Sequence, residues 1–292
     1  MTINSIKTSL TLIFLGFAIC AQAQLQFGFR AGLNSSTISS ESELDPVLGT
    51  ELETFSTSNG FHLGMAFGYE LNDFVGFRGE FLYNQKGYAY LFEGPAYQYF
   101  TSNSGNKILT TGTKRMAVRN SNAYIDIPVS FYVRPIKKLE FSFGAGIGFL
   151  VSSLGNGALE YNDIAGNIAN QSWDLNYNYS RDEAGEIVAL QEGTININGQ
   201  FVNQNAATGA YYDYDELDGK FFNAVNINLH GSVCFFLNSS VFLSARYFYG
   251  LSDITNDFYS VKKSVLDSDS NPIPNPQDNR SLSTQFSLGF YF

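Results

Sequence analysis

Hydrophobic and polar residues alternate along the chain with a period of two in eight separate segments. The last segment, QFSLGFYF, places Phe286, Leu288 and Phe290 on one side and ends on Phe292. A period of two is typical of β-strands, because successive side chains point to opposite faces. The pattern therefore predicts eight strands, at residues 25–33, 61–69, 75–84, 125–133, 139–149, 225–237, 241–250 and 282–292.

The composition of the two faces indicates which side faces outward. Alternation by itself also fits a soluble β-barrel or sandwich, in which the apolar face points inward. Here one face is bulky and apolar, and the other is mostly Gly, Ser, Ala and Asn with few charges. Small residues suit the narrow lumen of an eight-stranded barrel, and bulky apolar residues suit contact with lipid. We therefore expect an all-β fold, an eight-stranded antiparallel transmembrane β-barrel.

The connections between these strands are alternately short and long. The short ones are 71–73, 135–138 and 238–239, and the long ones are 35–60, 86–122, 151–223 and 252–281. This alternation is typical of outer-membrane barrels, which have short periplasmic turns and long extracellular loops. It predicts that both termini are periplasmic. Asn198-Gly199 is a hairpin signal and 181–186 resembles a second turn, so β-hairpins are expected within the extracellular loop 151–223.

The end of the chain also fits a barrel. A spanning sheet leaves no edge unpaired in lipid, so the last strand should pair with the first. Phe292 is then the terminal aromatic residue that the outer-membrane insertion machinery recognises, and we predict that it is an assembly signal. Pro128 is the one proline within a predicted strand, and a bulge is expected there because proline cannot donate to the ladder.

The start of the chain resembles an export signal. Lys7 precedes an apolar run from Leu10 to Cys20, which is shorter than the roughly 20 residues of a transmembrane helix. Ala21-Gln22-Ala23 then gives a small-x-small cleavage pattern, so residues 1–23 are predicted to be a signal peptide and 24–292 the barrel domain. Ile19 is too large for the usual lipobox, which argues against lipid attachment at Cys20.

Charge and cysteine content narrow the class further. The formal net charge is −10, which argues against nucleic acid as a partner because nucleic-acid binding requires concentrated Lys and Arg. Without the signal peptide only Cys234 remains, so no intramolecular disulfide is possible. No zinc-type cluster, phosphate-binding Gly loop or nucleotide fingerprint is present, and no cofactor or metal is expected.

The predicted strands resemble the PorT-like outer-membrane β-barrel family of Bacteroidota. The resemblance is carried by FGFRAGLNSS, GFHLGMAFGYELNDFVGFRGEFLYNQKGY, AYIDIPVSFYVRPIKKLEFSFGAGIGFLVS, VFLSARYFYGLSDI and NRSLSTQFSLGFYF. The AGLN, FLYNQKG and ARYxxGLxDI pieces are the most specific, and the long loops are not covered. The resemblance implies an outer-membrane barrel. The namesake of the family takes part in type IX protein secretion, which implies a role accessory to secretion as one expectation.

Several charged residues lie on the predicted lumen face. They are Arg30, His62, Glu70, Arg78, Glu80, Asp126, Glu140, His230 and Arg246. An unpaired buried charge is costly, so we expect these groups to pair across the lumen and to have a structural role. The central network is predicted to comprise Arg78, Glu80, Asp126, His230 and Arg246. The alternative is that the same charges line a narrow pore.

Two other arrangements were candidates for chemistry. His230 and Ser232 share a strand face, and some barrel lipid deacylases use such a pair as base and nucleophile. A hydrogen-bonded interior pair is the plainer interpretation. Asp213, Asp215, Glu216 and Asp218 could hold calcium, but their spacing departs from the EF-hand pattern, so a solvated acidic loop is expected.

The sequence thus predicts a non-enzymatic surface or envelope protein in the outer membrane. Its extracellular loops would be presented to a ligand or an envelope protein partner, and its barrel to outer-membrane lipid. The alternatives are a narrow transporter or pore and, less favoured, a lipid-modifying barrel enzyme.

Overall fold

The computed structural model describes residues 25–166 and 168–292, and the predicted signal peptide lies outside them. Strands account for nearly all of the regular structure, and one short 3₁₀ helix, η1 (Asp257–Tyr259), accompanies them. Within the described part of the chain, no helix is long and apolar enough to cross a membrane. Eight strands form a closed ring: β1 (Leu25–Ser39), β2 (Glu53–Asn72), β3 (Val75–Thr101), β4 (Lys107–Ile136), β5 (Leu139–Asp163), β9 (Val225–Phe236), β10 (Val241–Asp253) and β13 (Arg280–Tyr291).

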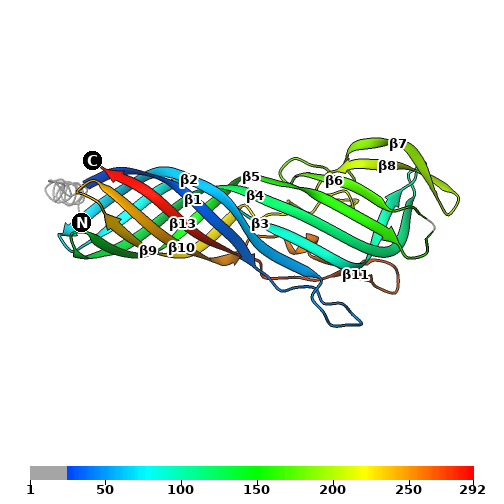
Figure 1. Ribbon diagram of the computed structural model, residues 1–292, viewed down its shortest axis with the longest axis horizontal. Helices are drawn as coiled ribbons and strands as arrows, with labels where there is room; N and C mark the ends of the chain where they lie inside the picture. The colour runs from blue at the N-terminus through cyan, green and yellow to red at the C-terminus, as the bar shows by residue number, and fades with distance from the viewer. Residues whose placement is uncertain (1–24, 167) are drawn as a thin grey trace, which may run out of the picture.

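The ring closes between its first and last strands. β1 pairs antiparallel with β13 from Gly28 opposite Tyr291 to Ser39 opposite Arg280, and it pairs on its other side with β2. The eight-stranded antiparallel barrel expected from the sequence is therefore confirmed. The start of β1 and the end of β13 lie together at one end of the barrel (Figure 1). We call this the proximal end.

The barrel has an apolar exterior and a polar interior. Outward-facing side chains are exposed along every strand, for example Leu33 at 70% and Phe143 at 66%, whereas Arg78 and Glu140 inside are 1% and 0% exposed. A soluble barrel has the opposite arrangement. Because a bulky apolar exterior is favourable only in contact with lipid, the faces predicted from the sequence are confirmed and the barrel spans a membrane.

β3, β4 and β5 continue far beyond the barrel at the end opposite the termini (Figure 1). β3 and β4 pair along nearly their whole length and are joined only by residues 102–106. The prediction of a loop at 86–122 is therefore wrong, because most of these residues continue the two strands. We call the part of the molecule beyond the apolar exterior the distal region. On its outer surface the exposed residues become polar, including Arg115, Arg119 and Glu160. This loss of apolar alternation is the reason why the sequence indicated loops.

A bulge in β5 accompanies this change of environment. Ala123 pairs with Ser152 and Tyr124 with Leu150, so Val151 has no partner on β4. The extra residue reverses which positions of β5 face outward, since exposed positions are odd-numbered up to Val151 and even-numbered beyond it. The bulge expected at Pro128 is absent. On the β5 side, Pro128 pairs with Gly146 in unbroken register. On the β3 side, two residue pairs are missing beside Pro128, but the register is the same before and after them.

Segment 151–223 adds three strands to the distal region: β6 (Gln171–Asn178), β7 (Ile187–Ile197) and β8 (Gln200–Thr208). β7 and β8 form a hairpin whose turn residues Asn198 and Gly199 both have positive φ, at 54° and 82°. A hydrophobic core fills the space between these strands and β3–β5, and it contains Phe100, Leu159, Trp173, Leu175 and Val202. Trp173 is therefore a core residue of the distal region. β11 (Val261–Leu266) and β12 (Pro272–Pro274) form a small separate hairpin.

Candidate functional site

The middle of the lumen holds one carboxylate between two guanidinium groups. Glu80 on β3 accepts hydrogen bonds from Arg246 of β10 at 2.8 and 2.5 Å and from Arg30 of β1 at 3.1 Å. Arg30 also donates to the hydroxyls of Ser244 and Ser287, at 2.8 and 2.6 Å. All of these side chains are buried, so the lumen is filled at this level.

A second group of charges lies nearer the proximal end. Arg78 pairs with Glu140 at 2.8 Å, and Arg134 joins Glu140 at 3.0 Å to Glu70 at 2.9 Å. The guanidinium of Arg78 also lies 5.1 Å from the centre of the Tyr132 ring. These ion pairs oppose each charge with one of opposite sign, and the aromatic ring adds a cation–π contact to Arg78.

A third group lies toward the distal region. Lys86 pairs with Asp126 at 2.7 Å, and Asp126 also accepts from Asn84 at 2.5 Å. Asn84 contacts Asn34 at 2.5 Å, and Asn34 in turn contacts His62 at 2.6 Å. His62 then reaches Ser287, which links this chain of hydrogen bonds to Arg30 and Glu80.

The structure therefore divides the predicted central network among neighbouring groups. Glu80 and Arg246 pair directly, whereas Arg78 pairs with Glu140 and Asp126 with Lys86. Lys86 was missed because it falls in the segment that the sequence indicated as a loop. Arg134 was missed because it lies at the end of a predicted strand, where alternation does not show which way it points.

His230 does not join the network. Neither of its ring nitrogens has a hydrogen-bond partner within the described residues, and its ring lies 5.2 Å from that of Phe248. Ser232 contacts Ser142 at 2.7 Å across the β5–β9 pair. The structure thus does not bring His230 and Ser232 into hydrogen-bond contact, and both are buried.

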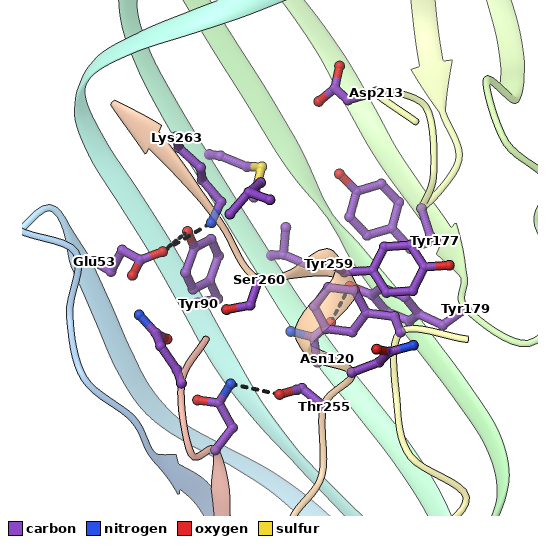
Figure 2. Close-up of a pocket in the computed structure, with 18 of the residues that line it drawn as sticks. Glu53, Tyr90, Asn120, Tyr177, Tyr179, Asp213, Thr255, Tyr259, Ser260 and Lys263 are labelled. Carbon is purple, nitrogen blue, oxygen red and sulfur yellow. Dashed lines mark hydrogen bonds and ion pairs between the residues drawn. The ribbon is translucent and has the colours of Figure 1, made fainter. Parts of the chain in front are cut away.

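The distal region contains a partly open cavity of about 200 Å³, which we call the distal cavity. β3, β4 and β6 provide its walls, together with residues 210–221 and the chain from Thr255 to Lys263. Figure 2 shows Tyr177, Tyr179 and Tyr259 on one side of the cavity and Glu53, Tyr90 and Lys263 on the other. The strands therefore bring together residues that are far apart in the sequence.

Tyrosine rings dominate the lining, and most of their hydroxyls are held by the protein. Tyr90 donates to Glu53 at 2.7 Å, Tyr179 to Asn120 at 2.7 Å, and Tyr97 to the carbonyl of Lys262 at 2.9 Å. Tyr214 and Tyr259 also donate to backbone carbonyls. Fixed hydroxyls hold the rings in place, so the cavity presents aromatic surfaces.

The charges around the cavity differ in how they are paired. Glu53 accepts from Lys263 at 3.1 Å. Burial opposes ionisation of Glu53, but Lys263 and the Tyr90 hydroxyl outweigh it and lower the pKa of this carboxyl. Lys114, by contrast, is 6% exposed, and within the described residues its ammonium forms no ion pair or hydrogen bond, although Asp213 and Glu43 attract it from a greater distance. Burial lowers the pKa of Lys114 to about 8.

The chain carries the signature of a known family. The family model described as "Outer membrane protein beta-barrel domain" matches residues 20–256. The chain belongs to this outer-membrane β-barrel family. A search among curated proteins gives no match.

Several solved structures resemble this outer-membrane β-barrel at low identity. The attachment invasion locus protein Ail of Yersinia pestis, solved with the heparin analogue sucrose octasulfate, is 11% identical with a TM-score of 0.36, over 92% of this chain and 99% of that one. OprG from Pseudomonas aeruginosa is 11% identical with a TM-score of 0.36, over 91% and 95%. Neisserial surface protein A is 12% identical with a TM-score of 0.29, over 91% and 97%. These scores are too low to support an inference about function.

The acidic loop of this barrel is tied to neighbouring strands. Asp213 accepts from Gln98 at 3.1 Å, and Asp215 pairs with Lys107 at 2.8 Å. No group of three potential metal-ligating side chains occurs in residues 25–166 and 168–292. The acidic residues thus help to anchor the segment that covers the distal cavity.

The sequence did not predict the distal cavity. The clearest sign of the cavity in the sequence is a set of tyrosine pairs spaced two residues apart: Tyr88 with Tyr90, Tyr97 with Tyr99 and Tyr177 with Tyr179. Spacing by two on a strand places both rings on one face. That signal was available, but without knowing that β3 and β6 approach each other it could not indicate a shared cavity.

Proposed function

We propose that this outer-membrane barrel is a non-enzymatic surface protein that binds a small ligand in the distal cavity. It is a PorT-like barrel of Bacteroidota, exported by the signal at residues 1–23. Its termini lie in the periplasm and its distal region outside the cell. The observation that carries the proposal is the concave, tyrosine-lined cavity, since concave aromatic sites with a few polar groups are typical of ligand sites.

A screen of small molecules would test the ligand-binding role. Purified protein in detergent would be exposed to a fragment and oligosaccharide library, with binding detected by saturation-transfer NMR. Met116 lines the cavity, so Met116→Trp should fill it and abolish the specific signals, whereas Val47→Trp on an exposed turn should leave them unchanged. If no compound distinguishes the wild type from Met116→Trp, the proposed function fails.

The orientation is testable on intact cells. An epitope inserted after Gly199, at the tip of the β7–β8 hairpin, should be reached by antibody without permeabilisation. An epitope placed at Asp73, in the short turn between β2 and β3, should require permeabilisation. The reverse result would place the distal region in the periplasm and overturn the surface role.

A narrow pore remains the alternative function. The paired charges of the lumen argue against it, because ions could cross only if Glu80 and its two arginines separated. We expect no conductance in planar bilayers. A conductance that changes with Arg78→Ala or Arg246→Ala would establish the pore instead.

Partner binding, including a role accessory to secretion, is a second candidate. β7 is the edge strand of the sheet, and Ile187, Val188 and Leu190 are all more than a third exposed. An open edge with apolar side chains can accept a strand from another protein. Gentle extraction through a tag in 151–223 should then recover one stoichiometric companion, and recovery of the barrel alone would remove this candidate.

A further inference from the structure

An unpaired cation faces the distal cavity. Lys114 lies on β4 between Gly94 of β3 and Tyr161 of β5, and its side chain lines the cavity. Its ammonium is 5.8 Å from the centre of the Tyr97 ring. We propose that the distal cavity binds a compact aromatic carboxylate, with Lys114 holding the carboxylate and tyrosine rings enclosing the aromatic body. This inference rests on the ligand-binding role proposed above and names its ligand class.

The other deeply buried cations show how this chain treats a structural charge. Within the described residues, Arg30 and Arg246 pair with Glu80, Arg78 with Glu140, and Lys86 with Asp126. Lys114 is buried nearly as deeply but has no such partner. Burying an ammonium without an anion is costly, so it persists where it serves another purpose. An anionic ligand would supply the missing partner.

The nearby carboxylates do not fill this role. Glu53 is bound to Lys263 and Tyr90. Glu43 accepts from the backbone amides of Lys263 and Ser264. Asp213 is exposed at the cavity edge and accepts from Gln98. Lys114 is therefore the one cavity charge available to a ligand's anionic group within the described residues.

The walls favour an aromatic body over a sugar. A sugar needs many hydrogen-bond partners, but the hydroxyls of Tyr90, Tyr97 and Tyr179 are already donated to protein acceptors. Most of the lining that remains for a ligand is ring and other apolar surface, which binds planar apolar groups well. One cation and several ring faces match one carboxylate on one aromatic ring.

The size of the cavity agrees with this ligand. A cavity of roughly 150 Å³ lined by apolar side chains holds a benzene molecule. The distal cavity, at about 200 Å³, thus has room for one aromatic ring and a short acidic substituent.

The test uses the full-length protein in detergent with phenylacetate as the probe and isothermal titration calorimetry as the readout. Phenylacetamide is the matched neutral ligand, because an uncharged amide of the same shape replaces the carboxylate. We expect phenylacetate to bind at least tenfold more tightly than phenylacetamide. Lys114→Met, which keeps an unbranched side chain of nearly the same length but removes the charge, should remove that preference and leave phenylacetamide binding unchanged.

Lys137→Met is the matched control variant. Lys137 is exposed in the short turn between β4 and β5, at the proximal end and far from the distal cavity. The control variant should bind phenylacetate as the wild type does. Heat-modifiable gel mobility would show that both variants fold. Equal binding of the two probes, or phenylacetate binding unchanged by Lys114→Met, overturns this inference. The proposed function survives that result if other library compounds still distinguish the wild type from Met116→Trp.

Discussion

At the scale of single residues, Lys114 should make the proposed ligand binding depend on pH. Its pKa of about 8 reflects burial first, with Asp213 and Glu43 raising it and Lys263 lowering it, and the Tyr97 ring packs against it. A bound carboxylate favours the protonated form, so affinity for phenylacetate should be constant below about pH 8. Above it, affinity should fall by up to about tenfold per pH unit. A titration from pH 6 to 9 checks this, and phenylacetamide should show no such fall.

The same residue should oppose folding stability. An unpaired buried charge costs about 1–3 kcal/mol or more, so Lys114→Met should raise the free energy of unfolding at pH 7 by about that amount. Urea titration in lipid vesicles measures it. A destabilised Lys114→Met variant would contradict the view that Lys114 is unpaired in the empty cavity.

Glu80 illustrates the opposite case, in which a buried charge is essential. Glu80→Gln would leave Arg30 and Arg246 without their carboxylate and should lower the free energy of unfolding by about 3–5 kcal/mol. Glu93→Gln is the control, because Glu93 and Arg115 are exposed and 3.7 Å apart, and an exposed pair contributes at most about 1 kcal/mol. Urea unfolding should therefore separate the two variants clearly. Similar losses would mean that the lumen charges are solvated.

At the scale of elements, the sequence predicts the membrane strands well and the distal region poorly. Between Phe141 and Phe149 a bulky apolar residue or alanine occurs at every second position, because lipid selects one face and the lumen the other. Beyond Val151 the outer face meets water and the bulge reverses the alternation, so the pattern that marks a strand is lost. Lumen partners such as Arg78 and Glu140 could be placed on a face, but pairing depends on strand register, which alternation does not fix.

The β7–β8 hairpin provides a test at this scale. Gly199 has φ of 82°, where a β-branched residue is strained, so Gly199→Val should loosen the hairpin. Hydrogen exchange over residues 187–208 should become faster while the barrel strands keep their protection. Gly79→Val is the matched control, since Gly79 lies in β3 with open space around its Cα. Unchanged exchange in Gly199→Val would mean that the turn does not hold the hairpin.

At the scale of the whole molecule, two opposite polarity patterns share the same continuous strands. The barrel is apolar outside and charged inside, and the distal region has an apolar core with Arg115, Arg119 and Glu160 on its surface. Because only the first pattern suits lipid, the change from one to the other marks where the bilayer ends. The position of a side chain relative to this change should therefore predict how deeply the side chain lies in the membrane.

Tryptophan fluorescence can measure that depth. Trp173 is the single tryptophan of the chain and lies in the distal core, so lipids brominated on their acyl chains should leave its emission nearly unchanged. Phe143→Trp in a Trp173→Phe background places the fluorophore on the barrel exterior, where its emission should be strongly quenched. Strong quenching of Trp173 would instead put the distal core within the bilayer. The distal cavity would then face lipid, and a water-borne carboxylate could not be its ligand.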